Sequence, residues 1–324
     1  THLSSLLHEV HPETRIYNLD IVEPGTPLPT VKNYKPALGK GEEHAATFIY
    51  CDVRQPIELE KVNITPDDVI FNFAAVHRTP GHPDPAYFET NIRGAENVCA
   101  FAERHGIRKI VFTSSIAPYG AAEELKEETT LPMPNTPYGI SKLVAEKIHQ
   151  TWQAGGEGRQ LTIVRPGVVF GRGENGNFTR LYWGIRGHKF MYPGRKDTIK
   201  ACIYVKELVR FMLYRLEHHD SGVELYNCCY EPAYTIEHIV ESMKRVTNMK
   251  VKVPFMPGWL IMTAAGIAGA LGSPMGICPA RVRKLQISTN ICGKKLSASG
   301  YRFRYTFEEA LADWYKDNGN LYLQ

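Results

Sequence analysis

Two residues one helical turn apart, Tyr138 and Lys142, carry the clearest chemistry in this sequence. Side chains four residues apart project from the same face of a helix, and an ammonium beside a phenol lowers the pKa of the phenol. Such a pair can take a proton from a substrate hydroxyl. Ser115 is the third candidate catalytic residue, because it follows an apolar strand predicted over 109–113.

The Tyr-x-x-x-Lys spacing occurs twice. Tyr192 and Lys196 repeat it, but the proline and glycine between them interrupt a helix. Thr136 and Pro137, by contrast, suit the N-cap and the first position of a helix predicted over 137–155. The second pair is therefore excluded and the first is retained.

The elements that would position these residues alternate along the first half of the chain. Strands are predicted at 14–21, 46–51, 69–75, 109–113 and 161–165, and helices at 55–61, 84–105 and 137–155. Strands that are apolar throughout and separated by helices indicate a parallel sheet covered on both faces. The sequence predicts a doubly wound α/β domain of Rossmann type over 1–166.

The second half, 167–324, is predicted to form a smaller, mixed substrate-binding cap. It is richer in glycine and proline, and its predicted helices lie at 177–186, 234–247, 279–287 and 306–317. Strands at 201–204 and 223–227 are expected to return to the main sheet, so the region 201–227 interleaves the two parts. Residues 22–44 are predicted to form a long surface loop.

Two aspartates suit a dinucleotide. Asp20 ends a predicted strand, where an acid binds the adenosine ribose, and Asp52 follows the next strand, where it suits an adenine contact. A Rossmann domain also needs a first strand and a glycine-rich turn for the pyrophosphate, and none precedes Asp20. We therefore expect a strand and a glycine-rich loop upstream of Thr1.

Composition excludes several classes of protein. A net charge of +4, without any run of five or six like charges, does not indicate nucleic acid binding. The seven cysteines are odd in number and never spaced Cys-x-x-Cys, which predicts neither a disulfide framework nor a zinc site and fits a reducing cytoplasm. His218 and His219 are weak metal-ligand candidates, because histidines at a helix end are more often solvated. We assign no metal.

Taken together, the motifs resemble the extended short-chain dehydrogenase/reductase superfamily, and within it the NAD-dependent epimerase/dehydratase family. The carrying segments include Cys51-Asp-Val-Arg54, Asn91-Ile-Arg-Gly94, Thr113-Ser-Ser115, Tyr138-Gly-Ile-Ser-Lys142 and Ile203-Tyr-Val205. The resemblance implies an NAD site lined by Asp20, Asp52, Val53, Ala74, Ala75, His77, Asn91, Tyr138 and Lys142. It also implies a homodimer formed by the helices at 84–105 and 137–155. An acid at Asp20 repels a 2′-phosphate and so favours NAD over NADP.

The resemblance also implies a mechanism. Tyr138, assisted by Lys142, takes the proton of a substrate hydroxyl while hydride leaves the same carbon, and Ser115 hydrogen-bonds the developing oxyanion. In an epimerase the keto sugar then rotates in its pocket, and hydride returns to the opposite face of the same carbon. No net oxidation results.

The substrate prediction comes from a segment in which this chain departs from the usual pattern of the family. Nucleotide-sugar enzymes of the family usually carry Arg-Pro-Phe-Asn where this chain has Arg165-Pro-Gly-Val168. This segment is similar instead to bacterial 4-epimerases of N-acetylglucosamine attached through pyrophosphate to undecaprenol. Candidate substrate contacts are Ser115, Asn177, Arg180, Lys189, Arg195 and Lys200.

We therefore expect a 4-epimerase of a pyrophosphate-linked N-acetylhexosamine or hexose, nucleotide- or polyprenyl-linked, in surface polysaccharide biosynthesis. The alternatives are an oxidoreductase of hydroxysteroid or dihydroflavonol type and a noncatalytic Rossmann scaffold.

An uncharged stretch, 253–279, raises the question of a membrane. Its prolines confine a helix to 258–272, which is too short to span a bilayer. It is either a buried cap helix or an interfacial one, and the basic residues around it, including Lys250, Lys252 and Lys284, suit anionic headgroups. In the second case, the region 253–284 would dock the enzyme at the inner face of the membrane.

Overall fold

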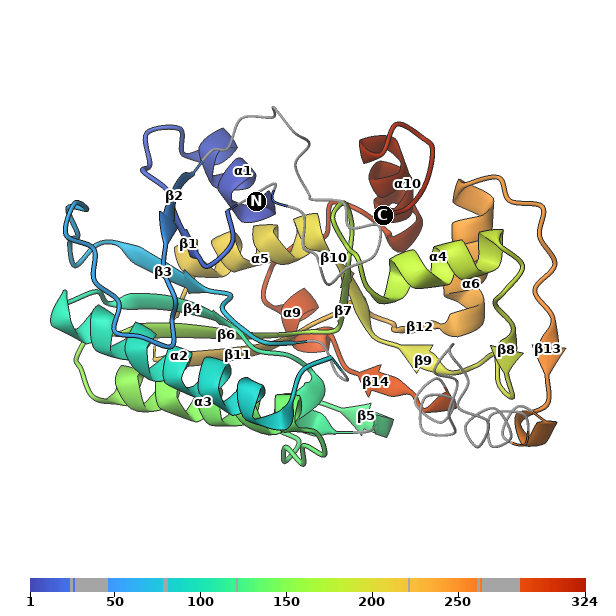
Figure 1. Ribbon diagram of the computed structural model, residues 1–324, viewed down its shortest axis with the longest axis horizontal. Coiled ribbons are helices and arrows are strands. Elements are labelled where there is room, and N and C mark those ends of the chain that lie inside the picture. Colours follow the sequence, from blue (N-terminus) through green and yellow to red (C-terminus); the bar gives the residue numbers. More distant parts are fainter. Residues whose placement is uncertain are drawn as a thin grey trace.

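The computed structural model describes residues 1–23, 26, 46–77, 81–120, 122–220, 222–260, 263 and 286–324 (Figure 1). Its main sheet has four parallel strands in the order β11-β6-β4-β3. Their bounds are Val69–Asn72 (β3), Lys109–Thr113 (β4), Gln160–Pro166 (β6) and Val223–Cys228 (β11). Of the two central strands, β4 leads to Ser115, and β6 follows α3, the helix that carries Tyr138 and Lys142.

Helices cover both faces of this sheet. In β4, Ile110 and Phe112 pack in one core cluster and Val111 in another, as expected for a strand buried on both sides. The helices α2 (Asp84–Arg104) and α3 (Pro137–Ala154) cover the first face. Helix α5 (Val205–Glu217) covers the second and contacts α1 (His2–Val10), as Figure 1 shows. The predicted doubly wound α/β class is confirmed.

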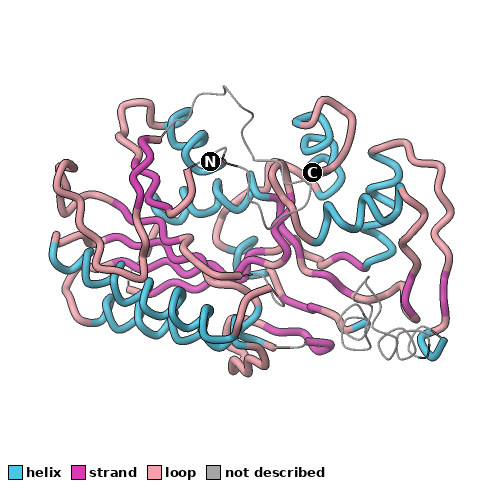
Figure 2. Tube along the Cα trace, in the orientation of Figure 1, coloured by secondary structure: helices cyan, strands magenta, loops and turns pink. Residues whose placement is uncertain are grey.

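A separate parallel ladder precedes β3 in the chain. It pairs β1 (Tyr17–Asp20) with β2 (Thr47–Tyr50). Leu19 of β1 packs in the same apolar cluster as Ile70 of β3, so the two ladders share one core. Figure 2 shows these strands with the main sheet and helices α2 and α3 below it.

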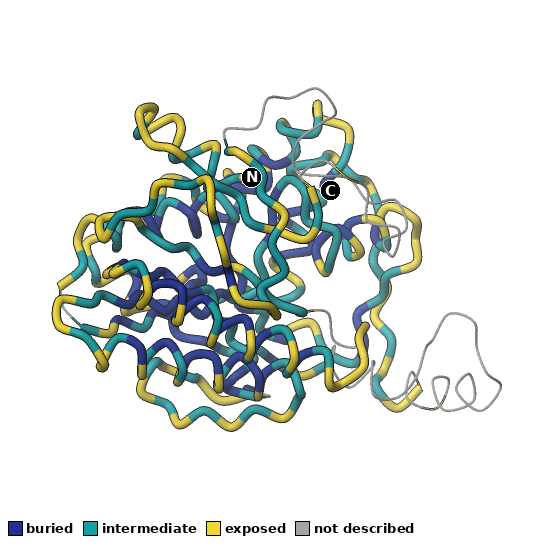
Figure 3. The backbone as a smooth tube through the Cα atoms, turned by 60° about the vertical axis from the view of Figure 1, so that its left-hand side comes forward, coloured by how far each residue is buried: buried dark blue, intermediate teal, exposed yellow. Residues whose placement is uncertain are grey.

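The cap is built from short elements around an aromatic cluster. Its helices are α4 (Asn177–Arg186), α6 (Ile236–Val246) and α10 (Phe307–Asp317), whereas α9 (Lys294–Ala298) packs against β11 of the main sheet. Its strands are β5 (Ala122–Lys126), β7 (Val168–Phe170), β8 (Tyr192–Pro193), β9 (Ile199–Lys200), β10 (Cys202–Tyr204), β12 (Tyr234–Thr235), β13 (Phe255–Met256) and β14 (Thr289–Ile291). Figure 3 shows buried residues along the main sheet and in this region. Phe170, Phe178 and Trp314 lie at the centre of the aromatic cluster.

One predicted helix, 55–61, is wrong. The segment has no helical residues; instead Ile57 is buried in the core beneath α2, and its carbonyl accepts a hydrogen bond from Arg104 at 2.7 Å. A side chain from α2 thus takes over a backbone acceptor that a helix would have used.

Three further predictions fall largely outside the described residues. They are the loop 22–44, the helix 279–287 and most of the uncharged stretch 253–279. Within the described part of the chain, no helix combines the length and the apolar character needed to cross a bilayer. The division of the chain at residue 166 remains a prediction.

Candidate active site

Ser115 and Tyr138 meet at the carboxyl end of the main sheet. Ser115 follows β4, Tyr138 is the second residue of α3, and the Ser115 side chain is near enough to lower the pKa of the Tyr138 phenol. Thr136 caps α3, its hydroxyl oxygen accepting the backbone N–H of Gly139 at 3.1 Å, so the predicted N-cap is confirmed. A Cβ at Gly139 would lie 2.6 Å from the carbonyl oxygen of Ala117. Glycine therefore lets α3 approach the segment that follows Ser115.

The ionisation of Tyr138 differs from the expectation. Burial raises the pKa of its phenol, and the Ser115 side chain acts in the opposite direction. The Lys142 ammonium faces the Phe112 ring, with Nζ 4.3 Å from the ring centroid. The proton of Tyr138 is therefore held more firmly than that of a solvated tyrosine.

Lys142 is an almost fully buried lysine, with 1% of its surface exposed. Burial lowers the pKa of its ammonium to about 7, and the negative charge of Glu146 opposes that shift. Long cationic side chains are rarely buried without a partner. A buried lysine near its titration point is typical of a functional site.

A buried network beside this lysine was missed by the sequence analysis. Glu146 accepts hydrogen bonds from Arg165 Nε at 2.8 Å and Nη2 at 2.6 Å, and from the Ser114 hydroxyl at 2.5 Å. Both charged side chains are at most 3% exposed. The signals were present: Glu146 lies one turn after Lys142, and Arg165 is a charge inside an apolar strand.

Asn91 fixes the other side of the catalytic helix. Its amide Nδ2 donates to Ser141 Oγ at 2.8 Å, and the Ser141 hydroxyl donates to the carbonyl of Tyr138 at 2.9 Å. Its Oδ1 accepts the N–H of Val76 at 2.8 Å. Asn91 thus links α2, the segment after β3 and the first turn of α3.

A buried histidine completes the packing between α3 and the sheet. His149 stacks on Phe112 with ring centroids 4.1 Å apart, and its Nδ1 lies 2.7 Å from the carbonyl of Ala145. Its Nε2 is 3.2 Å from the amide of Asn72. Burial lowers the pKa of His149 to about 4, so the ring is neutral at physiological pH and adds no charge near Lys142.

The candidate dinucleotide residues lie where strands end. Asp20 is the last residue of β1, is exposed, and accepts the N–H of Val22 at 3.1 Å. Asp52 follows β2, and its carboxylate pairs with Arg54 at 2.6 Å, a hydrogen bond that lowers the pKa of Asp52. An exposed acid at the end of β1 suits the hydroxyls of a ribose. The carboxylates of Asp20 and Asp52, which accept hydrogen bonds, therefore suit the adenosine end of NAD.

The remaining candidates for that site come from the segments after β2 and β3. The side chain of Val53 lies against α2, where a Cβ at Gly94 would come within 3.0 Å of it. Ala74 and Ala75 follow β3 and are half-buried, and His77 is exposed. Two alanines at a strand end leave room for a ligand to approach the backbone.

Helix α4 carries two of the candidate substrate residues. Arg180 donates from Nη2 to the side-chain oxygen of Asn177 at 2.8 Å, and both residues are exposed. Lys189 lies shortly after the helix and is exposed as well.

The other two cations belong to a different part of the cap. Arg195 pairs with Glu123 and with Asp197, each at 2.9 Å, and Lys200 donates to the carbonyl of Ile287 at 2.7 Å. Arg195 therefore already has two carboxylate partners. Arg180 and Lys189 thus lie on or just after α4, whereas Arg195 contacts Glu123 of β5 and Lys200 contacts the segment before β14, and the substrate roles of all four remain predictions.

The second Tyr-x-x-x-Lys pair is structural. Tyr192 lies on β8, Gly194 has a φ of 79°, and Lys196 pairs with Glu237 at 2.9 Å. The Lys196 ammonium lies 5.0 Å from the centroid of the Tyr192 ring, over its face. The predicted helix break between the two residues is confirmed.

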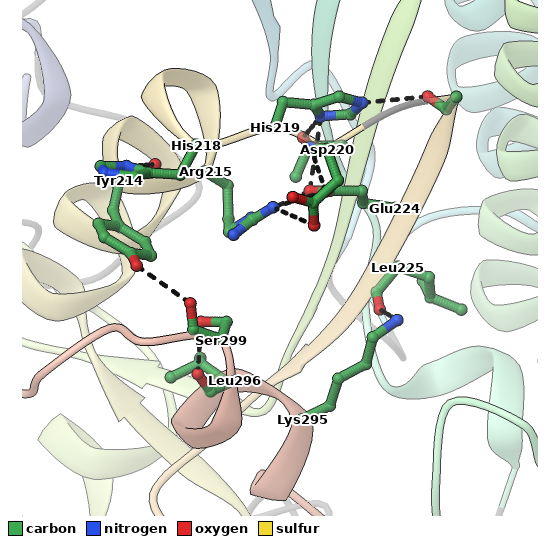
Figure 4. A network of polar contacts seen from close by, with 12 residues as sticks. Tyr214, Arg215, His218, His219, Asp220, Glu224, Leu225, Lys295, Leu296 and Ser299 are labelled. Carbon is green, nitrogen blue, oxygen red and sulfur yellow. Dashed lines mark hydrogen bonds and ion pairs between the residues drawn. The ribbon is translucent and has the colours of Figure 1, made fainter.

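His219 belongs to a buried network at the amino ends of β6 and β11, shown in Figure 4. Its Nδ1 lies 3.1 Å from the hydroxyl of Thr162 and 3.5 Å from Glu224, which pairs with Arg215 at 2.5 Å. These contacts join α5 to the sheet at the end opposite Ser115. Within the described ranges, no group of three or more His, Cys, Asp or Glu side chains is arranged to hold a metal ion.

The chain is similar to sugar epimerases in sequence. The NAD dependent epimerase/dehydratase family matches over residues 22–229. One relative, from Escherichia coli O157:H7, is 32% identical over 266 residues, which is 80% of each chain. Its name is N-acetyl-alpha-D-glucosaminyl-diphospho-ditrans,octacis-undecaprenol 4-epimerase. A UDP-glucose 4-epimerase from Lacticaseibacillus casei is 33% identical over 250 residues, covering 67% of this chain and 73% of the relative.

Solved structures agree on the fold. UDP-N-acetylglucosamine 4-epimerase from Methanobrevibacter ruminantium M1 matches with a TM-score of 0.73 and 19% identity, over 99% of this chain and 95% of the other. UDP-glucuronic acid 4-epimerase from Bacillus cereus, in complex with NAD, matches with a TM-score of 0.71 and 17% identity, over the same shares. Because the family model matches residues 22–229 and the sheet is of Rossmann type, this chain belongs to the NAD dependent epimerase/dehydratase family, and its cofactor is NAD.

Proposed function

We propose that this protein is a 4-epimerase of an N-acetylhexosamine or hexose carried on pyrophosphate, with a role in surface polysaccharide biosynthesis. The observation that carries the proposal is the proximity of the Ser115 and Tyr138 side chains at the carboxyl end of the sheet, one turn from a buried Lys142. The relative from Escherichia coli O157:H7 supports the sugar and its carrier.

Each residue has a distinct role in this proposal. Tyr138 takes the proton of the sugar 4-hydroxyl and later returns it, and Ser115 donates a hydrogen bond to the oxygen that becomes the keto group. Lys142 supplies positive charge that favours the phenolate. NAD, which the residues named above would hold, would supply a reversible hydride acceptor for C4. The sugar leaves with inverted C4 and no net oxidation.

The deciding experiment compares carriers. The protein is incubated separately with UDP-linked and polyprenyl-pyrophosphate-linked N-acetylglucosamine, and the sugar released by mild acid is identified. We expect N-acetylgalactosamine without any added oxidant, and faster conversion of the polyprenyl-linked substrate. Stoichiometric accumulation of NADH would instead identify a net oxidoreductase, and no conversion of either substrate would refute the proposal.

Peripheral membrane contact is the finer part of this proposal. Trp259 is 72% exposed and Phe255 is 51% exposed, and the exposed Lys250 and Lys252 precede them in the chain. In Figure 1, β13, which contains Phe255, lies at the edge of the molecule. Aromatic side chains beside lysines suit the interface of an anionic bilayer. Docking there would bring a lipid-linked sugar to the protein.

We expect Trp259→Ala to weaken binding to vesicles of phosphatidylglycerol and phosphatidylcholine about tenfold, because a large apolar contact with the interface is lost. Flotation of the protein with the vesicles measures this. Trp183→Ala, at an exposed tryptophan on α4, is the matched control and should bind like the parent. If the unmodified protein fails to float, or both variants bind equally, the membrane contact is refuted.

We also propose a homodimer formed through α2 and α3. The two helices pack side by side, and Ile140 and Val144, 40% and 36% exposed, are one turn apart on α3. Two such helix pairs would bury these side chains in a four-helix interface. Sedimentation velocity should give a dimer for the parent and a monomer for Ile140→Glu combined with Val144→Glu. A monomeric parent would contradict the proposal.

A further inference from the structure

We infer that Glu146 is a positioning residue, which holds the Lys142 side chain charged and which is itself tuned by Arg165. The catalytic part of this inference rests on the proposed function. The electrostatic part concerns only the folded protein and can be measured without a sugar substrate.

The first support is a brace that joins the candidate catalytic elements. Glu146 lies on α3, the helix that carries Tyr138 and Lys142, one turn beyond the lysine. Its carboxylate is bonded to Arg165 on β6 and to Ser114, the neighbour of Ser115 at the end of β4. One buried carboxylate thus ties the catalytic helix to the two central strands of the sheet.

The second support is a charge count. Lys142 and Arg165 are two buried cations, 1% and 3% exposed, and Glu146 is paired with Arg165 and lies one helical turn from Lys142. Arg165 makes two hydrogen bonds to Glu146, which raise the pKa of its guanidinium against the effect of burial and keep it charged. Glu146 therefore divides its negative charge between the two cations. Lys142 receives only part of it, in agreement with a pKa near 7.

The other groups around Lys142 do not supply this charge. On α3 itself, Tyr138 is one turn before the lysine and keeps its proton, and the neutral ring of His149 is one turn beyond Glu146. From β4, Phe112 presents the face of its ring to the ammonium. From α2, Asn91 reaches α3 through the hydroxyl of Ser141 and is uncharged. Burial has the largest effect on the pKa of Lys142, and Glu146 is the charged group that opposes it.

This balance gives predictions of opposite sign. Glu146→Gln removes the negative charge, so Lys142 should lose its proton at a pH lower by about one unit or more. Arg165→Gln frees the whole carboxylate for Lys142, which should then titrate about one unit higher. If the proposed reaction needs a charged Lys142, the alkaline limb of the pH–rate profile should move in the same two directions. A residue that only supported the fold would lower activity without opposite shifts.

The experiment uses the full chain with NAD bound and its lysines labelled with ¹³C at Cε. The Lys142 signal is identified by its loss in Lys142→Met, and its titration is followed in the parent, Glu146→Gln and Arg165→Gln. Glu146→Asp keeps the negative charge, so Lys142 should titrate in it as in the parent. If Glu146→Gln is poorly folded, Arg165→Gln still tests the upward shift of the Lys142 pKa. Titration at the parent pH in both charge-changing variants would overturn the inference. Opposite shifts in a protein that converts neither sugar would uphold it and refute only the proposed function.

Discussion

Replacing Tyr138 with phenylalanine is expected to reduce sugar interconversion about a thousandfold or more, since general acid–base catalysis contributes about 10²–10⁴-fold. The variant loses the phenol that carries the proton but keeps the aromatic ring, so α3 should pack as before. Conversion is measured by chromatography of the released sugar, and NAD binding by the absorbance and mass of the purified holoenzyme. NAD should remain bound at the parent stoichiometry.

Tyr192→Phe is the matched control for this experiment. Tyr192 has the same spacing to a lysine, and its buried hydroxyl has no hydrogen-bond partner among the described residues, so the substitution removes no hydrogen bond seen there. Activity should stay within about twofold of the parent. Undiminished turnover in Tyr138→Phe, or an equal loss in both variants, would contradict the role given to Tyr138.

Replacing Lys142 with methionine is expected to separate activity from stability. Activity should fall about 10²–10⁴-fold, because the positive charge that favours the phenolate is lost. The free energy of unfolding at pH 7 should nevertheless rise by about 2–4 kcal/mol, because the folded protein no longer buries an ammonium. Urea denaturation of both proteins at several pH values measures the difference.

The pH dependence of that difference has a definite sign. The pKa of Lys142 is about 7 in the folded protein and 10.5 in an unperturbed lysine. Between these values the unfolded chain binds a proton that the folded protein does not, so the stability of the parent rises with pH over this window. The advantage of the methionine variant should be full below pH 7 and vanish as pH approaches 10.5. Lys147→Met, at an exposed lysine on the same helix, should show neither effect. A parent that is more stable than Lys142→Met at pH 7 would disprove the burial argument.

Residues with strong local signals were predictable. Thr136 and Pro137 mark the start of α3 by their own chemistry, and the apolar run before Ser115 marks β4. Each of these patterns depends only on neighbouring residues, so it predicts the element without knowledge of the tertiary structure. They were enough to place Ser115 and Tyr138 at one end of a parallel sheet.

The buried ion pair could not be derived in the same way. Glu146 and Arg165 are on different elements, and their contact depends on how α3 lies against β6. The failed helix at 55–61 has a similar cause, since a bond from Arg104 on α2 decided the conformation of Ile57. The short cap strands, such as β8 and β9, are only two residues long and carry no periodic pattern.

The close approach at Gly139 limits how this protein can be engineered. Exchanging a helical glycine for alanine is a common route to a more heat-resistant enzyme, worth about 1 kcal/mol where the backbone allows it. At Gly139 the added methyl group would collide with the main chain at Ala117 and separate the two hydroxyls that hold the reaction centre together. At Gly184 on α4 the same methyl group meets only an ordinary contact, 3.4 Å from Phe190. Stabilisation by exchanging glycine for alanine is therefore expected to be tolerated at Gly184 in the cap but not at Gly139 in the first turn of α3.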